Sequence, residues 1–287
     1  MKKYIAGFLL VLMLITPLYA VSGFSITIGE ATNNNPAYKN SMLNYFQSKT
    51  DKNITDAEIK VITASEVNNV SKNVTGLVYP PSKIFSCAMV DLSYNNGIKV
   101  IVDKSKVRVV TPQMYANALE SSGIDRGYVV VSSPVPASGE AALAGVLKSY
   151  EIAVGKPIPE EAKQASTEEL YLETQLVNQT GQNGDTVAQL FSDVKNQTQS
   201  QNLQDPTQIK VIVINVANQM NINLTDNQTQ QIADSVANSQ KVQDNLTDFQ
   251  NQLQNVSQQV SNPGFMEQIT AFIQNLINSI QGIISGQ

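Results

Sequence analysis

Histidine, tryptophan and cysteine are scarce or missing from this chain of 287 residues. It has no histidine and no tryptophan, and its single cysteine is Cys87. Without histidine there is no Ser-His-Asp or Cys-His nucleophile, no imidazole general base and no histidine-ligated zinc. One cysteine cannot form an intramolecular disulfide, a redox pair or a cysteine-rich metal cage. We therefore expect no cofactor and no metal, and a fold held together by packing alone.

Charged side chains make up 15% of the chain, and their distribution is uneven. Residues 1–177 hold 16 basic and 16 acidic side chains, whereas residues 178–287 hold three lysines and eight acids. An acidic chain without a stripe of lysine and arginine has little attraction for a phosphate backbone. We therefore expect no nucleic-acid partner.

The N-terminus has the three parts of a secretory signal peptide. Two lysines precede an apolar run at residues 5–15, and small residues follow it. Cleavage after Ala20 and cleavage after Gly23 both suit this pattern, and an uncleaved anchor is the alternative because the stretch is nearly long enough to span a membrane. We assign residues 1–23 to the signal peptide and expect a secreted or extracellular cell-surface protein.

The next part of the chain, residues 24–158, alternates strand-like and helix-like segments. Apolar runs, several of them alternating with polar residues, predict strands at 24–29, 58–63, 84–92, 98–102 and 128–131. The turn Asn95-Asn96-Gly97 joins the third and fourth of these and predicts a hairpin. Helical spacing predicts helices that begin at Pro36, Ala64, Pro112 and Ser138. This order predicts an α/β or α+β domain with a small mixed sheet.

The part after residue 158 is predicted to be mostly helical. Composition changes at Asn178, because all ten tyrosines precede it and 39 of the 110 residues from there onward are Asn or Gln. The run Ile209–Ile214 suits either a buried helix or a strand. From Val242 to Val260, apolar residues spaced 4, 3, 4, 3 and 4 form a heptad seam that can pack on a partner helix. Residues 265–284 carry a broad apolar face, which we expect to pack on that helix or on a second copy rather than on a membrane.

These patterns divide the chain into four segments. We predict a signal peptide at 1–23, an α/β domain at 24–158, a helical extension at 159–203 and an Asn/Gln-rich helical tail at 204–287.

Several motifs between Cys87 and Glu169 occur in an order that matches a known family. They are Val109–Leu119 (VVTPQMYANAL), Val129–Gly139 (VVVSSPVPASG), Ala141–Gly145 with Tyr150-Glu151, and Glu160–Lys163 with Glu168–Leu170. Together they resemble a prokaryotic family of predicted secreted proteins catalogued as domain of unknown function number one thousand and two. The resemblance covers residues 24–195 and implies a secreted α/β domain followed by helices, with no reaction or catalytic residues to carry over. The region after Asn196 departs from the family pattern.

The connector after the strand at 128–131 is the candidate ligand loop. It contains Ser132, Ser133, Ser138 and Gly139, and it joins a buried strand to a helix, where backbone N–H groups often meet a ligand. The simpler interpretation is a rigid proline-containing connector in which Ser138 caps the helix, and no lysine or arginine stands nearby to hold an anion.

Other reactive side chains have structural explanations. The adjacent acids Glu160-Glu161 and Glu168-Glu169 could be glycosidase carboxylates, but favourable charge at a helix N-terminus explains them better. Ser192-Asp-Val-Lys195 matches the Ser-x-x-Lys pair of penicillin-recognising enzymes without its companion motifs, and we interpret it as a helix surface. Cys87 lies in an apolar strand and is interpreted as a small buried hydrophobic residue.

Asn-x-Ser/Thr triplets are more frequent than composition predicts, and six of the nine lie after residue 177. On a secreted chain they are candidate glycosylation sites, and compositional drift towards Asn and Thr is the alternative. The nine asparagines are Asn53, Asn69, Asn73, Asn178, Asn196, Asn223, Asn227, Asn245 and Asn255.

The sequence therefore predicts a secreted or cell-surface protein that acts without catalysis, in a structural or interaction-mediating role in the cell envelope. We expect a protein or cell-envelope partner and self-association through the C-terminal helices. The alternative is a carboxylate-dependent hydrolase, or a small-ligand-binding protein, that uses the loop at 132–139.

Overall fold

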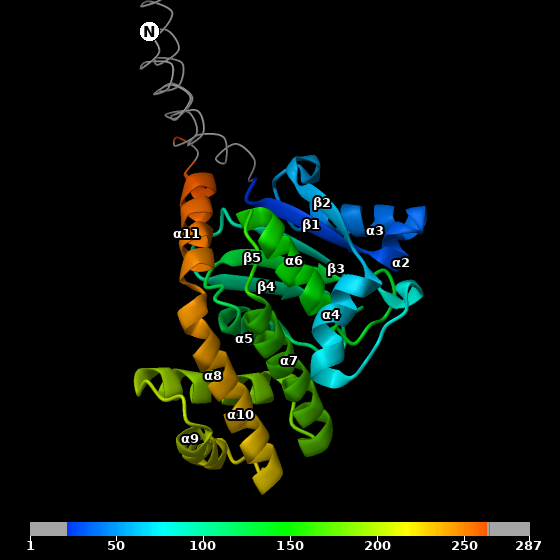
Figure 1. Ribbon diagram of the computed structural model, residues 1–287. Coiled ribbons are helices and arrows are strands. Elements are labelled where there is room, and N and C mark those ends of the chain that lie inside the picture. Colours follow the sequence, from blue (N-terminus) through cyan, green and yellow to red (C-terminus); the bar gives the residue numbers. More distant parts are fainter. Residues whose placement is uncertain (1–21, 263, 265–287) are drawn as a thin grey trace, which may run out of the picture.

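The computed structural model describes residues 22–262 and residue 264 (Figure 1). The expected signal peptide, except for Ser22 and Gly23, and the expected last helix at 265–284 lie outside the described residues. In the described part no helix is long and apolar enough to cross a membrane.

The sheet has five strands in the order β2-β1-β3-β5-β4. The parallel pairs are β1 with β2 and β4 with β5, whereas β3 runs antiparallel to both of its neighbours. The small mixed sheet is therefore confirmed. Its strands are β1 (Phe24–Gly29), β2 (Glu58–Ile62), β3 (Cys87–Asp91), β4 (Ile98–Val102) and β5 (Gly127–Ser132).

The predicted hairpin between residues 84–92 and 98–102 is wrong, because β5 lies between β3 and β4. Val129, Val130 and Val131 of β5 are fully buried, as is typical of a central strand. β4 carries the exposed Lys99 and suits the edge position. The turn before it still places Gly97 at a φ of +84°, which shows that local turn chemistry fixes the bend and not the pairing partner.

Helices cover both faces of the sheet. Met42 and Phe46 of α3 pack with Phe24, Ile26 and Ile28 on one face. On the other face α6 lies across β1 and β3, and its Gly145 carbonyl accepts a hydrogen bond of 2.9 Å from the Thr27 hydroxyl. The helices of this part are α2 (Glu30–Asn33), α3 (Pro36–Gln47), α4 (Ala64–Thr75), α5 (Pro112–Ser121) and α6 (Ala142–Val154), with 3₁₀ turns η2 (Ile54–Asp56) and η3 (Pro81–Lys83).

The rest of the described chain is helical, as predicted. The run Ile209–Ile214 lies within α9 and is helical, with Val211 and Ile214 exposed on the outer side. One hydrophobic cluster joins the sheet to these helices, from Ala88 to Val256. The elements are α7 (Glu160–Thr180), α8 (Gly184–Ser200), α9 (Pro206–Gln219), α10 (Asp226–Val242), η4 (Gln243–Asn245) and α11 (Thr247–Ser261).

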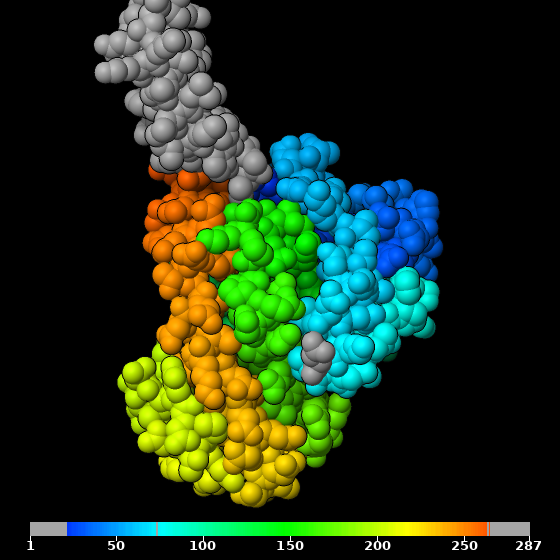
Figure 2. All heavy atoms as spheres, viewed as in Figure 1, coloured from blue at the N-terminus to red at the C-terminus, as the bar shows by residue number. Residues whose placement is uncertain are grey.

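The heptad seam is buried along the α/β part of the molecule. Figure 2 shows the orange atoms of α11 against the green atoms of α6. Leu246 packs on Gly123 in the turn after α5, and the Ser257 hydroxyl donates a hydrogen bond of 2.8 Å to the Leu92 carbonyl. The seam residues therefore pack on one helix and on loops at one end of the sheet.

The expected domain boundaries fall between elements, at 158/159 between α6 and α7 and at 203/204 between α8 and α9. The continuous cluster crosses both positions. The division into segments stays a prediction.

Candidate functional site: a buried lysine with two glutamates

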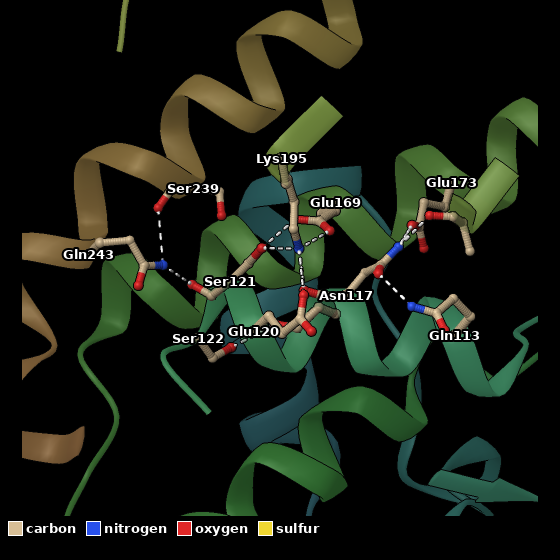
Figure 3. Close-up of polar contacts among 12 residues, drawn as sticks. Gln113, Asn117, Glu120, Ser121, Ser122, Glu169, Glu173, Lys195, Ser239 and Gln243 are labelled. Atoms are coloured by element: carbon tan, nitrogen blue, oxygen red, sulfur yellow. Dashed lines mark hydrogen bonds and ion pairs between the residues drawn. The ribbon is translucent and has the colours of Figure 1, made fainter. Parts of the chain in front are cut away.

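A polar cluster lies in the core where three helices meet (Figure 3). Asn117 and Ser121 extend from α5, Glu169 and Glu173 from α7, and Lys195 from α8. A spacing of four residues puts each pair on one face of its helix, and these faces are the buried ones. The packing of α5, α7 and α8 therefore brings together five side chains from three segments that lie far apart in sequence.

The Lys195 ammonium group is fully bonded inside this cluster. Its Nζ donates to the Asn117 carbonyl at 2.7 Å, to Glu169 Oε1 at 2.9 Å and to Ser121 Oγ at 3.1 Å. The Ser121 hydroxyl in turn donates to the other oxygen of Glu169. Glu169 is fully buried and Lys195 is 8% exposed. Three donors therefore meet three acceptors, which is the condition for keeping a charge away from water.

Glu173 is the second buried carboxyl group of the cluster. Its Oε1 accepts a hydrogen bond of 2.7 Å from Asn117, and its Oε2 has no hydrogen-bond partner in the described part of the chain. Burial, and then the negative charge of Glu169, raise the pKa of Glu173 well above its usual range. The cluster therefore places beside the ion pair a second carboxyl group whose surroundings favour the protonated form.

Two further side chains lie at the border of the cluster. Gln243, just after α10, donates to the Ser121 carbonyl at 3.5 Å and to the Ser239 carbonyl at 3.3 Å (Figure 3). The half-exposed Glu120 on α5 lies 3.8 Å from the Lys195 Nζ. Its pKa is raised by partial burial, an effect that the nearby Lys195 opposes. Glu120 thus lies between the buried ion pair and solvent.

The chemistry open to this arrangement is limited by its hydrogen bonds. Ser121 and Lys195 lie close enough for a serine nucleophile with a lysine base. However, the lysine is held as a cation by Glu169, and the serine proton points to that same carboxylate. The Ser121 hydroxyl and the Lys195 ammonium group are therefore both bonded to Glu169. Such bonds suit a structural role, in which they fix the register of the three helices, better than attack on a substrate.

The interpretation of Ser192-Asp-Val-Lys195 as a helix surface is wrong for the lysine. Lys195 follows Ala188 and Phe191 at spacings of seven and four, so it lies on the buried face of α8. That apolar spacing is the sequence signal that could have placed it inside. Its partner in the core could not be identified from spacing, because α7 and α8 meet only in the folded chain.

The helix-dipole explanation holds for one acidic pair only. Glu160 and Glu161 form the first turn of α7, as expected. Glu168 and Glu169 lie in its third turn, where the positive end of the helix no longer acts on them. Glu169 is instead the partner of Lys195.

The candidate ligand loop is bonded to its own protein. Ser132 donates to Asp103 at 2.9 Å, and the Ser138 carbonyl accepts from the amides of Val109 and Val110. The Gly139 carbonyl accepts from Tyr115, and a Cβ at Gly139 would collide with Val107 and Val110. The buried Ser133 hydroxyl has no partner among the described residues. The loop is therefore a connector packed on residues 106–110.

The expected helix start at Ser138 is also wrong. α6 begins at Ala142, and the Ala141 side chain makes no capping bond, whereas Ser138 is exposed outside the helix. The positive φ of Gly139, +113°, ends the connector and prevents a helix from forming there.

A small cavity of about 100 Å³ lies between α4, α6 and α7. Its charged groups pair with one another, because Glu151 lies 3.2 Å from Lys163 and 3.8 Å from Lys148. Among the described residues no group of three or more Cys, Asp or Glu side chains is placed to hold a metal ion. Cys87 is buried as predicted, and burial raises the pKa of its thiol to about 12.

The glycosylation candidates lie at the surface wherever the side chain is described. Eight asparagines are exposed, and Asn73 lies in α4. Asn53 has a structural role, since its side chain accepts from the Thr55 amide and caps η2. In four triplets the hydroxyl residue is buried, so a transferase would have to act before folding; these residues are Ser71, Thr198, Thr229 and Ser257.

The protein thus consists of a mixed sheet and a layer of helices that share one hydrophobic core. The chain belongs to the family described as "Protein of unknown function (DUF1002)", whose profile matches residues 28–256. It is 27% identical over 196 residues to "Uncharacterized protein YpuA" of Bacillus subtilis (strain 168), covering 65% of this chain and 67% of that protein. No solved structure gives a significant match.

The family match corrects one expectation from the motifs. The region after Asn196 was expected to depart from the family, but the match continues to Val256 at the end of the heptad seam. Despite its Asn/Gln-rich composition, this region carries apolar residues that join the hydrophobic core of the α/β part.

Proposed function

We propose that this protein works at the cell surface or outside the cell by binding, and that it performs no catalysis. One observation carries the proposal: the side chains with the most reactive chemistry, Ser121, Glu169 and Lys195, bond to one another inside the core. A catalytic group must reach its substrate, and these groups are at most 8% exposed.

The export part of the proposal rests on the N-terminal pattern and on contacts of Ser22 and Gly23. The Ser22 hydroxyl donates to the Phe24 carbonyl at 2.7 Å, and the Gly23 carbonyl accepts from the Leu92 amide at 2.8 Å. Cleavage after Gly23 would remove both contacts and put a charged amine on Phe24, which is 2% exposed. We therefore favour cleavage after Ala20, which keeps β1 and the contacts of Ser22 and Gly23 intact.

The hydrolase alternative has weaker support. Its candidate loop bonds to residues 103–110 and to Tyr115, and the pairs Glu160-Glu161 and Glu168-Glu169 point to separate structural roles. The Ser138 and Gly139 carbonyls of the loop thus already accept hydrogen bonds from within the protein.

Fractionation of the native host tests the proposal. We expect the protein in the envelope or the medium, and we expect S121A to leave its location and its retention by the envelope unchanged. Recovery of the protein in the cytoplasm would contradict export. An enzymatic activity of the wild type that is lost in folded S121A would contradict the non-catalytic role.

A further inference from the structure

The sheet edge beside α3 carries an unusual arrangement of aromatic and cationic side chains. We call it the tyrosine–lysine shelf and define it by Tyr45, Lys49, Tyr94, Lys99 and Tyr128. They come from α3 and the turn after it, from the segment between β3 and β4, and from β4 and β5. The lysines are exposed and the tyrosines half-buried, so the shelf faces solvent.

Contacts between neighbours make the shelf continuous. Lys99 stands beside Tyr128 in the β4–β5 pairing, and its Nζ lies 5.2 Å from the centre of that ring and 5.8 Å from the Tyr94 ring. The Tyr128 hydroxyl donates to the Lys49 carbonyl at 3.0 Å. The Lys49 Nζ lies 5.1 Å from the centre of the Tyr45 ring.

The two shelf lysines have no carboxylate partner, unlike other lysines of the described chain. Lys52, Lys163 and Lys195 each have a carboxylate within 3.2 Å. Among the described residues neither Lys49 nor Lys99 has a carboxylate within 4 Å. An aromatic ring orients an ammonium group without neutralising it. Both charges therefore remain available to an anion.

The tyrosines add hydrogen-bond donors and flat apolar surface. The hydroxyls of Tyr45 and Tyr94 make no hydrogen bond within the described chain, in contrast to Tyr128. Burial, with the charge of Asp103 next, raises the pKa of Tyr45 to about 12, so its hydroxyl keeps its proton. Asp103 itself is held by Ser105 and Ser132 at one end of the shelf.

We propose that the tyrosine–lysine shelf binds an acidic polysaccharide. Ammonium groups with no internal counter-ion match carboxylates repeated along such a polymer, and tyrosine rings and hydroxyls match the faces and hydroxyls of sugar rings. Two cations are too few to follow a nucleic-acid backbone, and the rest of the chain is acidic. The inference rests on the proposed function, since it names the partner of a protein that acts by binding.

Binding of the full chain to polygalacturonate at low salt tests this inference. The test variant K49Q/K99Q removes both shelf charges, and the matched control K72Q/K241Q removes two exposed lysines elsewhere. We expect the dissociation constant to rise by about tenfold or more in the test variant and by less than about twofold in the control. Y94S keeps the charge but removes a ring, and we expect it to weaken binding as well.

Several outcomes would overturn the inference. These are absence of polygalacturonate binding by the folded wild type, equal weakening in test and control variants, or equally tight binding of a single-stranded oligodeoxynucleotide. Binding to neutral dextran with no effect of K49Q/K99Q would also overturn it. None of these results affects recovery of the processed protein outside the cytoplasm, so a failure of the shelf is distinguishable from a failure of the proposed function.

Discussion

Among single side chains, Lys195 and Glu169 form a buried ion pair in the helical layer. Burying two charges costs solvation energy that their attraction barely offsets, so such a pair adds little net stability. Removing one partner is different, because the other charge then stays in the core without a counter-ion. The two charges are therefore paired only when α5, α7 and α8 pack in one particular register, so the pair favours that register.

Replacing Lys195 with methionine tests this role of the pair. We expect K195M to lower the free energy of unfolding by about 3–5 kcal/mol at pH 7, measured by urea denaturation. The double variant E169M/K195M should recover most of the loss, since neither charge remains. S192A, on the same helix and half-exposed, is the matched control. A loss in E169M/K195M as large as in K195M would contradict the account.

Glu173 gives a prediction with a defined pH dependence. Its pKa is raised in the folded state, so its contribution to stability is full below the unfolded value of about 4.5 and is lost as pH rises towards the folded value. E173Q keeps the acceptor for Asn117 and has no proton to lose. We expect E173Q to gain stability over wild type between pH 5 and pH 8, in thermal melts across that range.

The control for this experiment is E168Q, which makes the same change of charge at a half-exposed position of α7. Its stability difference from wild type should vary little with pH. A difference for E173Q that is constant with pH would show that Glu173 is ionised in the core, against the account.

Among the elements, α11 depends on a close approach at Gly123. This glycine has a φ of +76°, and a Cβ there would lie 2.7 Å from Leu246 Cδ1. Gly76, which ends α4, has a φ of +71° and nothing within 4 Å of its Cβ position. The two glycines share the backbone conformation and differ in packing.

Substituting alanine at each glycine separates these two effects. G76A should cost about 1 kcal/mol for the left-handed conformation alone. We expect G123A to cost about 1–3 kcal/mol more, because α11 must shift at Leu246. Equal losses of unfolding free energy in the two variants would mean that α11 does not pack as described.

Local patterns predicted elements better than they predicted partners. Helical spacing located the buried residues of α11, and the run Tyr128–Val131 identified a strand buried on both faces. The hairpin failed because an Asn-Gly turn fixes the bend at Gly97, whereas burial of β5 fixes the strand order. The Lys195 cluster was missed because its members come from three helices whose contact no local pattern encodes.

Across the whole molecule, one core joins segments of very different composition. The acidic Asn/Gln-rich part joins the same hydrophobic core through sparse apolar residues such as Phe249 and Leu253. The lysines without a counter-ion at the tyrosine–lysine shelf belong to the other part of the chain. This separation leaves an accessible cationic surface on an acidic protein, which suits a protein that acts by binding.

We propose that the mature protein is exported and begins just before β1. The most direct test is the intact mass of the protein purified from its native host. We predict the mass of a chain that starts at Val21, plus any sugars carried on the exposed asparagines. A chain that still begins at Met1 would contradict the account, and a chain that begins at Phe24 would contradict the role of Ser22 and Gly23 in holding the first strand.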